Sequence, residues 1–433
     1  MKSRADILPY PRDDFATWQE RWSRNPDDVA TELTRRLALM PEQLRRAVFA
    51  SVPDEDQIRE QIADVDDADA LPGVPFVVKD LFDMAGMLTR AGSTFLDEVR
   101  NVPSETSKLV ENLQDNGMIF SGKTQLNEFA FGLSGENPHS GDCPHPRVPD
   151  ALTGGSSSGS AWAVASGLVP FALGTDTAGS IRVPAAFCGI YGLRLVPNAW
   201  SRTGCFPLAP SFDTVGWFTS TAEDMRRATS ILVAETRDDV GRGLFCAGAF
   251  EDSHPELRAA AERIAQYLEL ERDPELEKWS RGIILGCEPA FDVLRNQEAY
   301  EVHAQWLDLM KDRYSIEVWE RINRGRHRDP SAISLAWDKR EQARKLIQIV
   351  FDQYDFLVLP VTPVPTPRKS EVTEELRRRL LTLNIPASFC AQPVLTVPLQ
   401  LADGRSGGLQ FIFRDMPSTA VGPLMEVMEA YRV

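Results

Sequence analysis

The chain has 433 residues, 43% hydrophobic and 25% charged, so it carries enough apolar material for a large core. Its 47 basic and 63 acidic residues give a net charge of −16. This charge excludes counterion-driven binding of nucleic acid over the whole surface and attraction to an anionic membrane. We therefore expect neither nucleic acid nor a membrane as a partner.

Cysteine usage and the first residues indicate a reducing compartment. The six cysteines are widely scattered and form no CxxC pair, which is typical of free thiols rather than of a disulfide framework. Residues 1–14 contain no apolar run of the kind that a secretory signal requires. The most apolar stretch, 161–174, is too short and too interrupted to span a bilayer. We expect a soluble, cytoplasmic protein.

Helical and strand-like patterns alternate over the first half of the chain. Apolar positions three and four apart predict helices over 27–40, 41–52, 106–117, 158–167 and around 174–190. Short apolar runs bounded by turn residues predict buried strands over 74–78, 118–122 and 169–173. This alternation favours an α/β architecture.

The second half of the chain departs from this alternation of helices and strands and later returns to it. Residues 221–355 are more charged and mostly helical in pattern, and we assign them no chemical role. Strand-like runs resume at 356–360, 394–400 and 408–413, before a helix-like end. We therefore predict a single large domain with a mixed central β-sheet covered by helices. Its parts are a helical segment (1–70), a core (72–220), a mostly helical insertion (221–355) and a return to the core sheet (356–433).

Two short motifs suggest other chemistry but lack its structural context. Residues 117–124 match the phosphate-binding loop GxxxxGK[ST], yet a predicted helix precedes the first glycine and a strand-like run fills the middle. Residues 155–159 match GxSxG, but the preceding segment contains two prolines and is a poor candidate for a strand. Only His254, His303 and His327 follow that serine, and we interpret each as a surface or turn residue. A Ser-His-Asp hydrolase therefore ranks third among the possible functions. No metal site is predicted, because there is no HExxH and only Cys143-Pro-His145 is suggestive.

Three separate features carry the chemistry. Lys79 directly follows the apolar run 74–78, so burial would lower its pKa and fit it for general-base work, unless it reaches solvent or pairs with Asp80. The run TGGSSSGS (153–160) places several hydroxyls before a helix, where they either relay a proton or only cap the helix. The small residues of GTDTAGSIR (174–182) allow backbone N–H groups to converge on an oxyanion.

Together these features resemble the amidase signature family. The likeness is strong over residues 72–220, including GKTQLNEFAFG (122–132) and SFDTVGWF (211–218), and looser from 356 onward. The resemblance implies a Ser–Ser–Lys triad, in which Ser180 is the nucleophile, Ser156 the bridging residue on a cis peptide, and Lys79 the base. Backbone N–H groups of an oxyanion hole are implied at Thr177, Ala178, Gly179 and Ser180, and supporting positions at Ser157, Thr175, Asp176 and Arg182. One departure is Ala178, which stands where many members have glycine.

The resemblance also implies an activity. We expect an amidohydrolase that cleaves a small soluble carboxylic amide to an acid and ammonia or an amine, through a seryl acyl-enzyme and without a cofactor. The alternative is the glutaminase (A) subunit of a tRNA-dependent amidotransferase, which uses the same signature with glutamine and a partner subunit. A third class is a binding protein without activity, against which the intact triad argues. A homodimer is a further possibility that the sequence leaves open.

Overall fold

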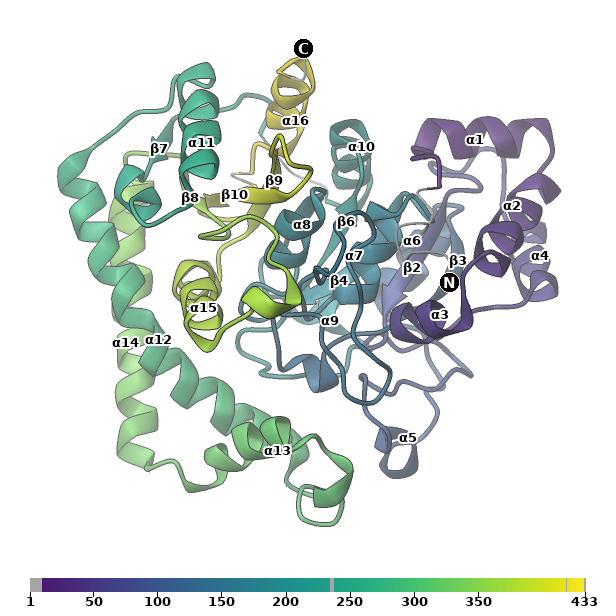
Figure 1. The fold of residues 1–433 in the computed structure, drawn as a ribbon, viewed down its shortest axis with the longest axis horizontal. Helices are drawn as coiled ribbons and strands as arrows, with labels where there is room; N and C mark the ends of the chain where they lie inside the picture. Colours follow the sequence, from purple (N-terminus) through teal and green to yellow (C-terminus); the bar gives the residue numbers. More distant parts are fainter. Residues whose placement is uncertain (1–9, 234–236, 418, 432–433) are drawn as a thin grey trace.

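A computed structural model describes residues 10–233, 237–417 and 419–431, and over 278–285 it describes the backbone only. Within these residues ten strands form one mixed sheet in the order β1-β3-β2-β4-β6-β5-β9-β10-β8-β7 (Figure 1). The strands are β1 (Phe49–Ser51), β2 (Pro75–Lys79), β3 (Ile119–Thr124), β4 (Phe171–Asp176), β5 (Tyr191–Arg194), β6 (Thr214–Thr219), β7 (Gly243–Phe245), β8 (Phe356–Pro360), β9 (Val394–Gln400) and β10 (Ser406–Phe413).

The parallel part of the sheet holds the segments that the sequence singled out. β2 lies between β3 and β4 and is parallel to both, whereas β4 is antiparallel to β6. Every residue of β2, β3 and β4 is buried, as expected of strands that are covered on both faces. The carboxyl ends of β2 and β4 therefore bring Lys79 and Asp176 to the same edge of the sheet.

Helices surround the sheet and account for most of the remaining described chain (Figure 1). They are α1 (Phe15–Arg24), α2 (Asp27–Ala38), α3 (Glu42–Val48), α4 (Glu55–Ala63), α5 (Leu96–Val99), α6 (Lys108–Asp115), α7 (Ser158–Ala165), α8 (Arg182–Cys188), α9 (Ala199–Arg202), α10 (Ala222–Leu232), α11 (Pro255–Tyr267), α12 (Pro274–His303), α13 (Ile316–Asn323), α14 (Pro330–Phe351), α15 (Glu374–Phe389) and α16 (Val421–Ala430). None of the helices in the described ranges combines the length and the apolar character that crossing a membrane requires.

The region between 221 and 355 contains one element that its sequence pattern did not predict. The short strand β7 pairs in parallel with β8 and forms one end of the sheet, although the helical pattern around it hides so short a run. The long helices α12 and α14 lie side by side along one flank of the molecule (Figure 1). This region therefore contributes both a sheet edge and a helical wall.

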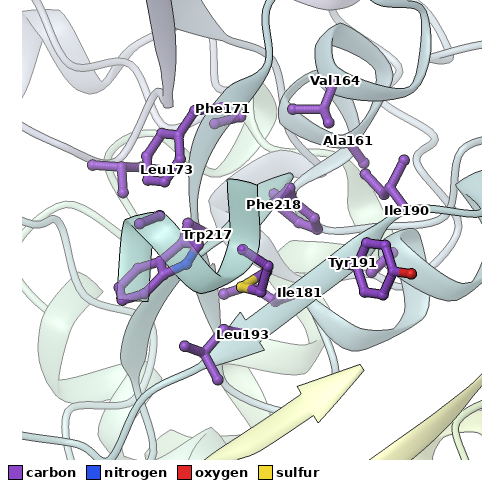
Figure 2. Close-up of a cluster of buried hydrophobic side chains, with 14 of the residues drawn as sticks. Ala161, Val164, Phe171, Leu173, Ile181, Ile190, Tyr191, Leu193, Trp217 and Phe218 are labelled. Carbon is purple, nitrogen blue, oxygen red and sulfur yellow. The ribbon is translucent and has the colours of Figure 1, made fainter. Parts of the chain in front are cut away.

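A buried aromatic cluster fixes the centre of the sheet beneath the catalytic segments. Phe171 on β4 stacks on Trp217 of β6 with ring centroids 6.2 Å apart, and α7 covers them with Ala161 and Val164 (Figure 2). Trp217 is fully buried and belongs to the core, whereas Trp200 is 51% exposed. Because α7 and β4 pack on the same cluster, the serine-rich turn before α7 (residues 153–157) is held beside the end of β4.

Candidate active site

Lys79 is buried completely at the carboxyl end of β2. Its Nζ donates to Oγ of Ser156 at 2.7 Å and to Oγ1 of Thr175 at 2.8 Å. Burial lowers the pKa of Lys79 from 10.5 to about 7, although the charges of nearby Cys205, Asp176 and Asp213 oppose part of this effect. About half of the amines are therefore neutral at pH 7, and a neutral amine is able to accept a proton.

Asp80 does not neutralise Lys79, because a second lysine pairs with it. Nζ of Lys123 lies 2.8 Å from Oδ1 of Asp80, and both side chains are buried. The same ammonium donates to the carbonyl of Leu88 and to Oγ1 of Thr89, each at 2.8 Å. Lys123 is the lysine of the phosphate-loop match, so it serves an internal ion pair, and it lies in β3 rather than in a loop.

The peptide bond between Gly155 and Ser156 is cis, as the family resemblance implied. A Cβ at Gly155 would overlap Oδ1 of Asn127, so this position accepts only glycine. The backbone N–H of Asn127 donates to the carbonyl of Ser156 at 3.3 Å, and Ser157 Oγ donates to the carbonyl of Thr175 at 3.2 Å. These contacts bind the serine-rich turn to the end of β4.

Ser180 lies in the tight loop between β4 and α8 and is 4% exposed. The backbone N–H of Ser157 donates to the carbonyl of Ser180 at 3.3 Å, which brings the loop against the serine-rich turn. Within the described residues, no hydrogen bond links the Ser156 and Ser180 hydroxyls. The structure thus joins Lys79 to Ser156 directly, and joins Ser180 to the pair through the backbone.

Three of the four expected oxyanion-hole donors are available. In the part of the chain that the structure describes, the backbone N–H groups of Thr177, Ala178 and Ser180 have no acceptor. Gly179 differs from the expectation, because its N–H donates to Oδ1 of Asp176 at 2.8 Å and so holds the shape of the loop. Three of the four expected donors are therefore left without an acceptor in the described residues, and the fourth is not.

Asp176 organises the loop from a fully buried position. Burial raises the pKa of its carboxyl, but the guanidinium groups of Arg182 and Arg194 together outweigh this, so the pKa lies well below its usual range. Arg182 donates to both carboxylate oxygens at 2.8 and 3.1 Å, and Arg194 donates to Oδ1 at 3.1 Å and to the Asp176 carbonyl. The backbone N–H of Ile181 adds a further bond at 3.0 Å.

Several residues of this network were not singled out from the sequence. Arg194 ends β5, and its charge within a buried strand was a signal that sequence reasoning missed. The other partners of Arg182 are the carbonyl of Asn384, the Ser388 hydroxyl and the Gln410 amide oxygen, all some 200 residues along the chain. No local pattern marks these positions.

The histidines serve the structure rather than a catalytic triad. His303 is fully buried, so its interpretation as a surface or turn residue was wrong; its Nδ1 pairs with the Tyr314 hydroxyl at 2.8 Å and accepts from Trp306. Burial lowers its pKa to about 3, which keeps the ring neutral. His254 caps the start of α11.

A cavity of the described residues lies away from the predicted catalytic residues. It has a volume of about 740 Å³ and lies between η3 (Ala247–Phe250), α11 and α15, and none of the predicted catalytic residues lines it. No group of three or more His, Cys, Asp or Glu side chains in the described residues is arranged to hold a metal ion.

The chain is similar to known amidases and to amidotransferase subunits. The family profile described as Amidase matches residues 28–264. The chain is 29% identical to Amidase 1 of Oryza sativa subsp. japonica, over 79% of this chain and 87% of the relative. It is 33% identical to the A subunit of the glutamyl-tRNA(Gln) amidotransferase of Chromohalobacter salexigens, over 80% of each. A crystal structure of an amidase superposes with a TM-score of 0.82 at 28% identity, covering 97% of this chain and 100% of that one.

The family profile covers more than half of the chain, and the solved amidase shares the fold over nearly its whole length. The α/β domain with a ten-stranded mixed sheet is thus the fold that the sequence resemblance predicted. The chain belongs to the amidase signature family.

Proposed function

We propose that the protein hydrolyses the carbon–nitrogen bond of a small soluble carboxylic amide through an acyl-enzyme on Ser180. The observation that carries this proposal is the buried contact between Nζ of Lys79 and Oγ of Ser156, at 2.7 Å. An amine with a pKa of about 7, bonded to a serine hydroxyl and screened from water, supplies the base that such a reaction needs.

Acylation begins with proton transfer along the two serines. Neutral Lys79 takes the proton of Ser156, and Ser156 takes the proton of Ser180 as its oxygen attacks the substrate carbonyl. A C–O bond forms, and the carbonyl π electrons move onto oxygen, where the N–H groups of Thr177, Ala178 and Ser180 stabilise the charge. The proton then returns through Ser156 to the substrate nitrogen, the C–N bond breaks, and ammonia or an amine leaves.

Deacylation repeats these steps with water as the nucleophile. The water proton passes to the Ser156–Lys79 pair, the hydroxide oxygen bonds to the acyl carbon, and the Ser180 oxygen leaves and recovers its proton. The products are a carboxylic acid and free enzyme. No cofactor takes part in any of these steps.

A panel of small amides scored by release of ammonia tests the proposal. Ser180→Ala and Lys79→Ala are each expected to lower kcat/KM by about 10⁴-fold or more while retaining the native fold by circular dichroism. In the parent, kcat/KM should rise with pH through about 7 and level off above it, because only neutral Lys79 accepts a proton. A fluorophosphonate probe should label Ser180. A fully active Ser180→Ala variant would end the proposal, and an unlabelled, inactive parent would favour a binding protein.

A second candidate is the glutaminase subunit of an amidotransferase, supported by the 33% identity to such a protein over 80% of both chains. In that case glutamine is the ammonia source and activity depends on a partner protein. The purified chain should then release ammonia from glutamine poorly when alone and from other amides not at all. Robust hydrolysis of another amide by the isolated chain rules this candidate out.

We further propose a cytoplasmic location. None of the six cysteines forms a disulfide within the described residues, and five of them are buried; cysteines that stay reduced suit a reducing compartment. Cell fractionation tests the location, and light scattering of the purified chain measures whether it forms the homodimer that the sequence left open.

A further inference from the structure

A buried carboxylate that the mechanism does not use lies behind the oxyanion loop. Asp213 immediately precedes β6, and its Oδ1 accepts a hydrogen bond from Oγ1 of Thr177 at 2.6 Å. Its Oδ2 accepts from the backbone N–H groups of Leu208 and Ala209 at 2.8 and 2.9 Å. The three hydrogen bonds that this carboxylate accepts therefore come from one side chain and from one loop.

Thr177 is the first donor of the oxyanion hole, and its hydroxyl is held while its backbone N–H has no acceptor among the described residues. A hydrogen bond to a carboxylate is short and directional, so it fixes where the Thr177 backbone stands. Resting on the proposed function, we propose that Asp213 is a positioning residue, which aligns Thr177 in the oxyanion hole.

The loop that carries Asp213 is itself held by the long helices of residues 221–355. The backbone N–H of Ser211 donates to Oε2 of Glu298 on α12 at 2.9 Å, and Nη2 of Arg340 on α14 donates to the Ser211 carbonyl at 2.7 Å. The Arg340 guanidinium also lies 4.4 Å from the centroid of the Phe212 ring. The helical wall, to which the sequence assigned no role, thus reaches the active site through this loop.

The hydrogen bonds to Asp213 are those that a carboxylate accepts. Burial raises the pKa of Asp213, and the hydrogen bonds from Thr177, Leu208 and Ala209 oppose part of this effect. Only the ionised carboxylate accepts at both oxygens without also donating, so these three donors favour that form. The tether to Thr177 is therefore a hydrogen bond to a buried carboxyl group.

Substitutions at the two ends of the hydrogen bond test the tether. Thr177→Val removes the hydroxyl, so we expect kcat to fall about tenfold or more and KM to change less. Thr177→Ser restores the hydroxyl and should recover most of the lost kcat, which a merely structural role would not require. Asp213→Asn replaces the carboxylate by a weaker, neutral acceptor, so kcat should fall in this variant too.

The double variant completes the test. If Asp213 acts through Thr177, the kcat loss in the combined Thr177→Val, Asp213→Asn protein is smaller than the product of the two single losses. The rate at which a fluorophosphonate labels Ser180 gives a second readout that needs no amide substrate. Thermal unfolding midpoints show whether each variant folds, and if Asp213→Asn does not, Thr177→Val and Thr177→Ser alone test the tether.

Each contrary outcome overturns the proposal. A Thr177→Val protein with the kcat and labelling rate of the parent shows that the tether does not align the hole. A folded Asp213→Asn protein with the kcat of the parent shows that the carboxylate does not position Thr177. If the parent is active and the Ser180→Ala variant is not, the proposed amidase function remains supported after either of these results. An inactive, unlabelled parent refutes the amidase function itself, and the role of Asp213 with it.

Discussion

Replacing Lys79 by methionine should change the stability of the protein in a pH-dependent way. Methionine has a similar length and no charge, so it removes the cost of burying an ammonium group. The pKa of Lys79 falls from 10.5 to about 7 on burial, which at 1.36 kcal/mol per pKa unit corresponds to about 5 kcal/mol.

The direction of the effect follows from proton linkage. Below about pH 7 the lysine is charged in both the folded and unfolded states, and the full cost of about 5 kcal/mol opposes folding. Between about pH 7 and 10.5 the unfolded chain binds more protons than the folded one, so the cost shrinks as pH rises, to about 2 kcal/mol at pH 9. Above 10.5 the lysine is neutral in both states and the cost disappears.

Methionine also leaves the Ser156 and Thr175 hydroxyls without their hydrogen bonds to Nζ, at a cost of about 1–3 kcal/mol each that does not depend on pH. This loss changes the difference in unfolding free energy by the same amount at every pH, so it leaves the pH dependence of that difference unchanged. The free energy of unfolding of Lys79→Met minus that of the parent should therefore fall by about 3 kcal/mol between about pH 6 and pH 9.

Urea unfolding of both proteins, followed by the fluorescence of the nine tryptophans at several pH values, gives this difference directly. Titrating groups that do not interact with Lys79 act equally on both proteins and cancel. A difference that is the same at about pH 6 and pH 9 would mean that the amine keeps an ordinary pKa in the folded state. In that case Lys79 is charged at neutral pH and is not the base.

Two further substitutions test how the catalytic loops are held. Asp176→Asn leaves Arg182 and Arg194 buried without their counterion, and we expect a loss of about 3–5 kcal/mol in unfolding free energy together with loss of turnover. Gly155→Ala places a methyl group against Oδ1 of Asn127, and we expect it to displace the serine-rich turn and lower kcat about 100-fold or more, with little loss of stability elsewhere.

Matched surface positions provide the controls for these two variants. Asp403 pairs with Arg405 at 2.7 Å where both side chains are partly exposed, so Asp403→Asn should change stability by less than about 1 kcal/mol. A Cβ added at Gly404 would have nothing within 4 Å, but the φ of +82° makes alanine costly there, so Gly422→Ala in α16 is the better glycine control. If Asp176→Asn is no more destabilising than Asp403→Asn, the buried carboxylate does not anchor the loop.

The candidate catalytic residues could be singled out from the sequence because each one lies in a local pattern that the family resemblance also contains. Lys79 ends a fully apolar run, Ser156 follows two glycines, and Ser180 lies among small residues before a helix. Six of the ten strands were predicted from short apolar runs, whereas β1, β5, β6 and β7 were not. The predicted helix over 41–52 was wrong at its end, where β1 lies, and the three or four residues of β1, β5 and β7 are too few to show a period.

The residues that hold the catalytic ones in place have no such signature. Arg194 reaches Asp176 across the sheet, and Asp213 reaches Thr177 from a separate loop. In each case a buried charge meets its partner only after the chain has folded, so the pairing belongs to the tertiary structure rather than to any window of sequence.

This difference explains why the sequence misjudged Gly179. Convergent N–H groups were inferred from small residues alone, and four donors were expected. In the folded loop one of those donors, the Gly179 N–H, binds Asp176 instead, because a buried carboxylate requires hydrogen-bond donors from the turn that covers it. The number of N–H groups that this loop leaves without an acceptor is therefore set by what lies beneath it, where Asp176 takes the donor of Gly179.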